Sequence, residues 1–172
     1  MALLMVFGAA VHLGLPPEAL RTALLVTGLA LLPIAVLMIR QVRRGAWGNV
    51  DASERRERPL LFTVGMASLG VLLAVQLALH PGSFLVRGML GVLLMLGLCA
   101  VLTRWVKVSL HLAFGALAAT TLLSLGSPIG WALFAFLPVL AWSRLTLGRH
   151  RPAEVALGLL VGAAFGAGIA GF

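Results

Sequence analysis

Charge, acidic side chains and cysteine are all scarce in this 172-residue chain. Only 10% of the residues are charged and 61% are hydrophobic, which excludes a soluble globular domain because one core of this size cannot bury so much apolar surface. The single cysteine, Cys99, excludes an internal disulfide and a cysteine metal site. The five acidic residues form no carboxylate cluster, so we expect neither a metal nor another cofactor.

Apolar runs of about 20 residues, the length that crosses the hydrocarbon core of a membrane, alternate with short polar segments. The sequence therefore predicts an all-α, polytopic transmembrane helix bundle that forms a single domain over residues 1–172. The predicted elements are a short or half-inserted apolar helix at 1–13 and six main spans at 19–39, 60–79, 84–102, 108–125, 129–145 and 155–172.

The last predicted span has a stripe of small residues. Gly158, Gly162 and Gly166 recur at a spacing of four, which lets membrane helices approach closely. We expect this stripe to serve packing and not chemistry.

The thirteen basic residues give a net charge of +8 and gather in segments between the predicted spans. Short basic loops of this kind meet anionic lipid headgroups or phosphate, so we expect a membrane partner and no nucleic acid. Hairpins of two spans separate the segments 40–59, 103–111 and 143–154, which are therefore expected on one side of the membrane. Eleven of the thirteen cations fall on that side and only Arg21 and Arg87 on the other, so the side with the three segments is predicted to be cytoplasmic.

Segment 143–154, with the sequence SRLTLGRHRPAE, holds the densest group of ionisable residues. Pro152 suits the first turn of a helix, so we expect a helix to begin near His150 and to place Glu154 on the same face. The carboxylate would fix the tautomer of the imidazole, while free N–H groups at the helix start would favour an anion beside the ring. The alternative interpretation is a basic loop that caps two transmembrane helices.

The order Ser-Arg, five residues, His, three residues, acid resembles the third signature of the type 2 phosphatidic acid phosphatase (PAP2) superfamily. The acid in that family is usually aspartate, and here it is Glu154. The resemblance covers about residues 51–166 and implies a small, divergent membrane lipid phosphatase.

Residues 51–59 resemble the first PAP2 signature, in which a lysine is followed after six residues by Arg-Pro. Arg58 and Pro59 match, but Asp51 stands at the lysine position. We expect Arg55 or Arg56 to replace the missing phosphate ligand and Asp51 to orient an arginine. The alternative is a basic loop with salt-bridged arginines.

Residues 108–111, VSLH, resemble the second PAP2 signature, Pro-Ser-Gly-His. Ser109 and His111 match, whereas Val108 and Leu110 do not. On a regular helix Lys107 and His111 share a face and Ser109 points away. We therefore expect Lys107 to assist His111, with Ser109 contributing only if the helix begins irregularly.

The PAP2 resemblance implies a metal-independent reaction through a phosphohistidine. His150 would be the nucleophile, Glu154 would orient it, and His111 would protonate the leaving alkoxide. The expected phosphate-binding residues are Arg144, Arg58, Lys107, Ser109, Arg55 and Arg151, with Asp51 and Ser143 in support.

A site at this depth implies a lipid substrate whose phosphate lies at headgroup level: phosphatidate, phosphatidylglycerophosphate, or an isoprenoid phosphate or diphosphate. We favour isoprenoid phosphates, because the chain has no soluble domain to hold a complex headgroup, and we expect a bacterial or archaeal cell membrane. Two alternatives stay open. One is a non-catalytic lipid-phosphate binder or transporter of the same fold, and the other is a phosphotransferase that passes the phosphate to an acceptor other than water.

Overall fold

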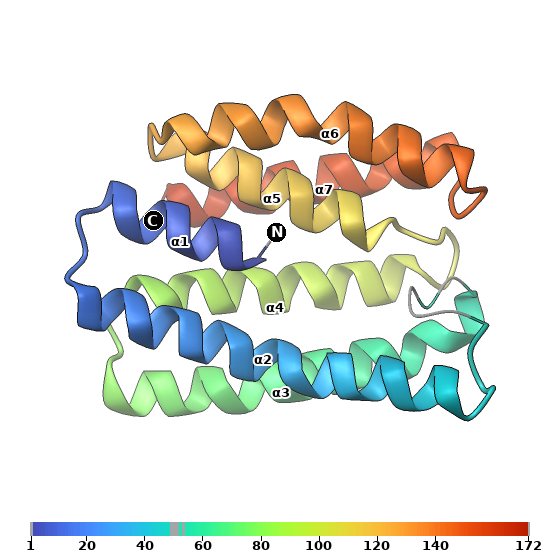
Figure 1. Cartoon of the computed structure of the whole chain (residues 1–172), viewed down its shortest axis with the longest axis horizontal. Coiled ribbons are helices and arrows are strands. Elements are labelled where there is room, and N and C mark those ends of the chain that lie inside the picture. Colours follow the sequence, from blue (N-terminus) through green and yellow to red (C-terminus); the bar gives the residue numbers. More distant parts are fainter. Residues whose placement is uncertain (1, 49–51, 53, 172) are drawn as a thin grey trace.

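The computed structural model describes residues 2–48, 52 and 54–171, which are helices and short connections without a strand (Figure 1). Seven α-helices and one 3₁₀ turn form in these ranges: α1 (Ala2–His12), α2 (Pro17–Arg43), η1 (Arg55–Glu57), α3 (Arg58–Leu79), α4 (Phe84–Leu102), α5 (Leu110–Ser124), α6 (Pro128–Thr146) and α7 (Pro152–Ala170). The all-α prediction is therefore confirmed. The predicted helix at 84–102 has the observed bounds, and the other main helices differ from their predicted bounds by a few residues at their ends.

Five of the described helical segments are long and apolar enough to cross a membrane: Pro17–Arg43, Arg55–Leu79, Phe84–Leu102, Pro128–Thr146 and Pro152–Ile169. Leu29, Val71 and Leu160 are large apolar side chains that point outward with more than half of their surface exposed. Such a surface is stable only against hydrocarbon, so the protein is an integral membrane protein. The prediction of six main spans is confirmed for five, because the helix expected at 108–125 is only 15 residues long, as α5.

The short helix α5 is the most enclosed element of the bundle. Leu112, Leu117 and Leu122 have at most 1% of their surface exposed, and α5 packs against α1, α6 and α7. The helix was predicted to begin at Val108, but Val108 lies outside it, Ser109 is extended and the helix starts at Leu110. This shift changes which side chains at the start of α5 share a face.

The helices α5 and α7 approach each other closely along the glycine stripe. A Cβ atom at Gly158 would lie 2.6 Å from the carbonyl oxygen of Ser109, and one at Gly166 would lie 2.7 Å from that of Leu117. At Gly162 a Cβ atom would overlap the carbonyl group of Ala113. Only glycine permits these backbone contacts, so the packing role predicted for the stripe is confirmed.

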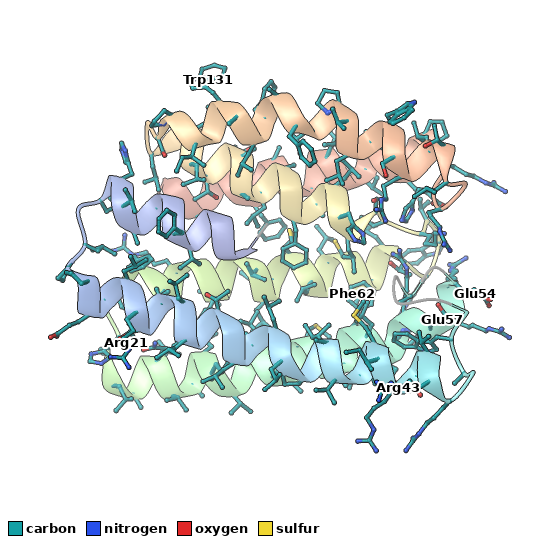
Figure 2. The ribbon with its side chains drawn as sticks, in the orientation of Figure 1. Arg21, Arg43, Glu54, Glu57, Phe62 and Trp131 are labelled. Atoms are coloured by element: carbon teal, nitrogen blue, oxygen red, sulfur yellow. The ribbon has the colours of Figure 1, made fainter. Side chains whose placement is uncertain are left out.

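The three segments that resemble PAP2 signatures meet at one end of the bundle (Figure 1). The connections after α2, α4 and α6 lie at this end, and those after α3 and α5 lie at the other. Figure 2 shows Arg43, Glu54 and Glu57 at the first end and Arg21 at the second. The predicted convergence of the segments is confirmed, and we call this end the signature end.

The α5–α7 contact can be tested by adding one methyl group at Gly162. We expect Gly162→Ala to lower the free energy of unfolding by about 1–3 kcal/mol, because the methyl group must push the two backbones apart. Gly168→Ala is the matched control on the same helix, since a Cβ atom there meets nothing within 4 Å. This control should be neutral or gain up to about 1 kcal/mol from helix propensity. Unfolding of both variants in detergent, followed by circular dichroism, makes the comparison, and equal stability of the two contradicts the packing.

Candidate functional site

The loop that carries His150 is fixed by the way helix α6 ends. Gly148 adopts a left-handed φ of +63°, its amide donates to the carbonyl of Leu145, and the Arg149 amide donates to that of Arg144. These two bonds form a Schellman motif, which needs glycine at the left-handed position. The His150 amide also donates to the Arg144 carbonyl at 3.3 Å, and Pro152 then opens α7. The residues from Arg144 to Pro152 therefore form a tight, defined turn.

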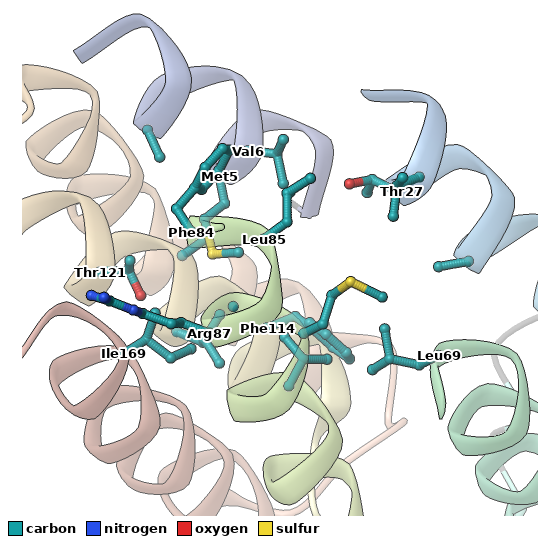
Figure 3. Close-up of a pocket in the computed structure, with 18 of the residues that line it drawn as sticks. Met5, Val6, Thr27, Leu69, Phe84, Leu85, Arg87, Phe114, Thr121 and Ile169 are labelled. Carbon is teal, nitrogen blue, oxygen red and sulfur yellow. The ribbon is translucent and has the colours of Figure 1, made fainter. Parts of the chain in front are cut away.

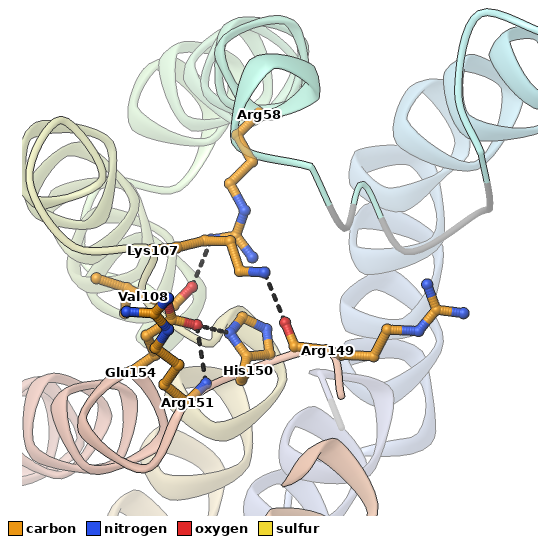
Figure 4. A network of polar contacts seen from close by, with 7 residues as sticks. All are labelled: Arg58, Lys107, Val108, Arg149, His150, Arg151 and Glu154. Carbon is orange, nitrogen blue, oxygen red and sulfur yellow. Dashed lines mark hydrogen bonds and ion pairs between the residues drawn. The ribbon is translucent and has the colours of Figure 1, made fainter. Parts of the chain in front are cut away.

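His150 and Glu154 form the central pair of the site (Figure 4). The ring nitrogen Nδ1 lies 2.8 Å from Glu154 Oε2, and the side chains of His150 and Glu154 are only 5% and 15% exposed. Glu154 Oε2 also accepts a hydrogen bond from the Arg151 amide at 3.2 Å, which holds the carboxylate against the start of α7. The carboxylate selects the tautomer with a proton on Nδ1 and leaves Nε2 with a lone pair. The contact expected between these two side chains is present, although α7 begins at Pro152 and not at His150.

Contacts from the connection between α4 and α5 hold this pair in place. The Ser109 amide donates to the backbone carbonyl of Glu154 at 3.2 Å. Lys107 Nζ donates to the Arg149 carbonyl at 2.6 Å, so that the ammonium group lies over the His150 loop. These bonds join the second and third signature segments directly.

The first signature segment contributes two arginines. Arg58, which is buried at the start of α3, donates through a guanidinium nitrogen to the Val108 carbonyl (Figure 4). Arg55 donates through Nε to the Thr103 carbonyl at 2.6 Å. Both arginines therefore bind the connection between α4 and α5, and all three signature segments are hydrogen-bonded into one unit.

An open depression lies in front of the His150–Glu154 pair. Its charged lining in the described part of the chain consists of one carboxylate, Glu154, and the cations Arg55, Lys107, Arg149 and Arg151. Trp105, whose side chain is 70% exposed, forms part of the rim. Because positive charge prevails, the depression suits an anion with several oxygen atoms.

The environment keeps His150 neutral at physiological pH. Burial of the ring lowers the pKa of His150 from 6.5 to about 4, against the opposing effect of the hydrogen bond to Glu154. The positive charges of Arg58 and Lys107 add to the lowering. Burial also lowers the pKa of Lys107 below its usual value. A neutral ring with Nδ1 protonated is the form in which Nε2 can attack an electrophile.

Five residues predicted for the site line the depression: His150, Glu154, Lys107, Arg55 and Arg151. Arg58 lies behind this lining with 3% of its surface exposed, and its charge still acts on His150. Arg56 forms an exposed ion pair with Glu54 at 2.6 Å, so of the two arginines proposed to replace the signature lysine, Arg55 is the one at the site. Asp51 lies outside the described residues.

Four further predicted positions do not line the depression. His111 is an exposed residue on the first turn of α5. It does not share a helical face with Lys107 as expected, because α5 begins only at Leu110, and assistance of His111 by Lys107 stays a prediction. Ser109 is the residue before the helix, and its buried Oγ makes no hydrogen bond within the described residues. Arg144 and Ser143 shape the turn through their carbonyl groups: that of Ser143 accepts a hydrogen bond from the Leu147 amide, and that of Arg144 accepts from the amides of Arg149 and His150.

The sequence interpretation missed two residues that contribute to the site. Arg149 lines the depression and holds Lys107 through its carbonyl, and its place next to His150 was the available signal. Glu57 is buried with 4% exposure, and its carboxylate accepts bonds from the amides of Gly48 and Glu54 at 3.3 and 3.0 Å. Glu57 thereby fixes the turn that carries Arg55 and Arg58, a role that the pattern of acids in this loop does not reveal.

Comparisons of the chain with protein-family models, curated proteins and solved structures find no match. Within the described residues, no group of three or more His, Cys, Asp or Glu is arranged to hold a metal ion. The site is therefore defined by its own geometry: a buried histidine–carboxylate pair that faces a cationic depression.

The protonation state of His150 gives a direct test of this environment. We expect NMR titration of the histidine rings in detergent to place the pKa of His150 near 4, with His150→Asn assigning the signal. Since the pKa is below that of the unfolded chain, the unfolded state binds the proton first as the pH falls below 6.5. Stability should therefore decrease between about pH 6.5 and 4, and less so in His150→Asn. A pKa at or above 6.5 contradicts the buried, neutral ring.

Proposed function

We propose that the protein is a PAP2-like lipid phosphatase that uses His150 as its nucleophile. The observation that carries this proposal is the 2.8 Å contact between Nδ1 of His150 and Glu154, which leaves Nε2 for phosphorus beside four lining cations. The resemblance of three sequence segments to PAP2 signatures supports the same assignment, since these segments meet at this depression.

In the proposed reaction, Nε2 of His150 attacks the phosphorus atom of a lipid phosphate. The Nε2–P bond forms as the bond from phosphorus to the leaving oxygen breaks. A lipid monophosphate then releases an alkoxide that must take up a proton, and a lipid diphosphate releases the lipid monophosphate. Glu154 stabilises the positive charge that develops on the ring, and the arginines stabilise the phosphoryl oxygens. Water then attacks the phosphohistidine, giving inorganic phosphate and free His150.

The proton for the leaving alkoxide has two candidate donors. The PAP2 resemblance gives this step to His111. The position of Lys107 favours this residue as the donor, because it lines the depression. Burial also lowers the pKa of Lys107, which makes its ammonium group a better acid than that of an exposed lysine. His111 lies on the first turn of α5, outside the described lining.

We propose a membrane lipid as the substrate because the depression lies where apolar helices end and Trp105 is exposed at its rim. Tryptophan prefers the headgroup region, so a phosphate in the depression would lie at headgroup depth. In this arrangement α5 is a sixth, enclosed span and α1 is half-inserted. An isoprenoid phosphate or diphosphate fits best, since the described loops at the signature end are too short to hold a large headgroup.

One alternative function has structural support. Arg58 is engaged with the Val108 carbonyl, and Ser109 Oγ is buried away from the depression, so two of the expected phosphate ligands do not face a substrate. A lipid-phosphate binder or transporter needs only the cationic depression. A phosphotransferase would form the same phosphohistidine and differ in the acceptor.

The first test of the proposed phosphatase activity removes the imidazole of His150. We expect His150→Ala to reduce release of inorganic phosphate by at least about 1000-fold, measured on farnesyl phosphate, undecaprenyl diphosphate and phosphatidate in detergent. His80→Ala is the matched control, because His80 caps α3 at the opposite end and should leave the rate unchanged. Near wild-type turnover in His150→Ala overturns the proposal. Binding of these lipids without any phosphate release by the wild type favours the binder.

The distribution of basic residues between the two ends of the bundle is the basis for orienting the site in the membrane. Of the eleven cations at the signature end, seven remain if Arg58, Lys107, Arg144 and Arg151 are set aside as phosphate ligands, against two at the other end. We therefore propose that the site faces the cytoplasm of a bacterial or archaeal cell.

Cysteine labelling in intact cells tests this orientation in a Cys99→Ala background. We expect Gly48→Cys, at the signature end, to react with a membrane-impermeant maleimide only after permeabilisation. Gly82→Cys, at the opposite end, should react at once, and both positions have open space for a side chain. The reverse pattern places the site outside and contradicts the charge argument.

A further inference from the structure

A second cavity lies inside the bundle, separate from the depression at His150. It has a volume of about 310 Å³ and is lined by residues of α1 to α5 and α7 (Figure 3). Met5, Leu85 and Phe114 are typical of its lining, which is almost entirely apolar. An almost entirely apolar cavity of this size within membrane helices suits hydrocarbon better than water, because its wall offers water few polar partners.

The few polar groups of the wall reinforce this conclusion. The hydroxyl of Thr27 donates to the Ala23 carbonyl at 2.8 Å, and that of Thr121 donates to the Gly166 carbonyl at 3.2 Å. Both hydroxyl protons are therefore already used within the helices. The remaining polar side chain in the described lining is that of Arg87, which extends along the wall toward Thr121 (Figure 3).

Buried side chains of α3, α4 and α5 bound the cavity on the side that faces the proposed catalytic site. On α3, α4 and α5 its lining reaches Gly65, Leu96 and Phe114. The buried side chains of Phe62, Cys99 and Leu112, at most 4% exposed, occupy the next turns toward the signature end. An alkyl chain in the cavity therefore enters from elsewhere than the His150 depression.

Arg87 identifies the end from which the chain enters. It stands on the first turns of α4, at the end opposite to His150, and its side chain is exposed while its neighbours Leu85 and Val86 are buried. A guanidinium group near the membrane surface attracts an anionic headgroup. We propose that the cavity binds one alkyl chain of an anionic phospholipid from the leaflet opposite to the catalytic site, with its phosphate at Arg87. This lipid is a bound structural partner and is distinct from the substrate.

Gly88 is a position from which a larger side chain can be introduced into the cavity. A Cβ atom at Gly88, which lines the cavity, meets nothing within 4 Å, and the same is true of Gly97, which lies on α4 outside the lining. Gly88→Leu therefore places a side chain in the lipid site, and Gly97→Leu is the matched control on the same helix. Both changes raise helix propensity equally.

The experiment measures lipid bound to the purified protein by native mass spectrometry, with dioleoyl phosphatidylglycerol and dioleoyl phosphatidylcholine as probes. We expect the wild type and Gly97→Leu to retain one phosphatidylglycerol with about fivefold preference over phosphatidylcholine, the ratio that one interfacial cation supplies. Gly88→Leu should lose the bound lipid, and Arg87→Gln should bind both lipids equally.

Retention by Gly88→Leu at the level of Gly97→Leu overturns the proposed site. Loss of the preference in Lys107→Gln, with Arg87→Gln unchanged, would place the headgroup at the catalytic end and also overturns it. His150→Ala should retain the lipid like the wild type, so the outcome is independent of the proposed phosphatase activity.

Discussion

Backbone contact between α5 and α7 is the constraint on which the candidate site depends. Gly158, Gly162 and Gly166 bring the axis of α7 so close to α5 that the Ser109 amide reaches the carbonyl of Glu154. That bond lies beside the carboxylate that holds His150. A wider separation of the two helices would carry Glu154 away from Lys107 and from Arg58. The glycine stripe therefore acts through packing: it sets the distance between α5 and α7, and this distance sets the geometry of the site.

The membrane environment explains why cations at the site bind backbone carbonyl groups of neighbouring segments. Arg55, Arg58 and Lys107 each donate to a backbone carbonyl of another segment. Connections between membrane helices leave carbonyl groups that need donors, and buried cations need acceptors, so both requirements are met together. The same bonds tie the three polar segments into one unit at the signature end. In the described lining of the depression, four cations outnumber the single carboxylate of Glu154, so the depression stays positive and suited to a phosphate.

Much of the fold could be predicted from the sequence, because apolar runs and turns fix the helices and because pairs of spans return the chain to one side. The His150–Glu154 contact was also predictable, since Gly148 and Pro152 define the turn and a spacing of four defines the face. The residue at which α5 starts could not be predicted. Periodicity extends the helix to Val108, but the bonds from Arg58 to the Val108 carbonyl and from Ser109 to Glu154 keep this stretch extended. These are tertiary interactions with no local signal, and neither they nor the bond from Lys107 to the Arg149 carbonyl could be predicted from the sequence.

The short length of α5 and the roles of Glu57 and Arg87 also could not be predicted, because they too depend on tertiary contacts. The 15-residue α5 is enclosed by its neighbouring helices, which composition alone does not indicate. Glu57 looks like one more charge in a basic loop, and its burial against two amides is visible only in three dimensions. In the sequence, Arg87 serves only as one of the charges that predict the orientation of the chain in the membrane. In the bundle, it borders an apolar cavity.

The central claim is that His150 becomes covalently phosphorylated by a lipid phosphate at its Nε2 atom. Rapid quenching of the purified protein with lipid labelled by ³²P in its phosphate group, followed by peptide mapping, tests it most directly. We predict a label on the peptide that contains His150, stable to alkali, labile to acid, and lost when the reaction is chased with unlabelled substrate. Phosphate release by the wild type with no label on that peptide at any quench time, or with label on another residue, would contradict the account.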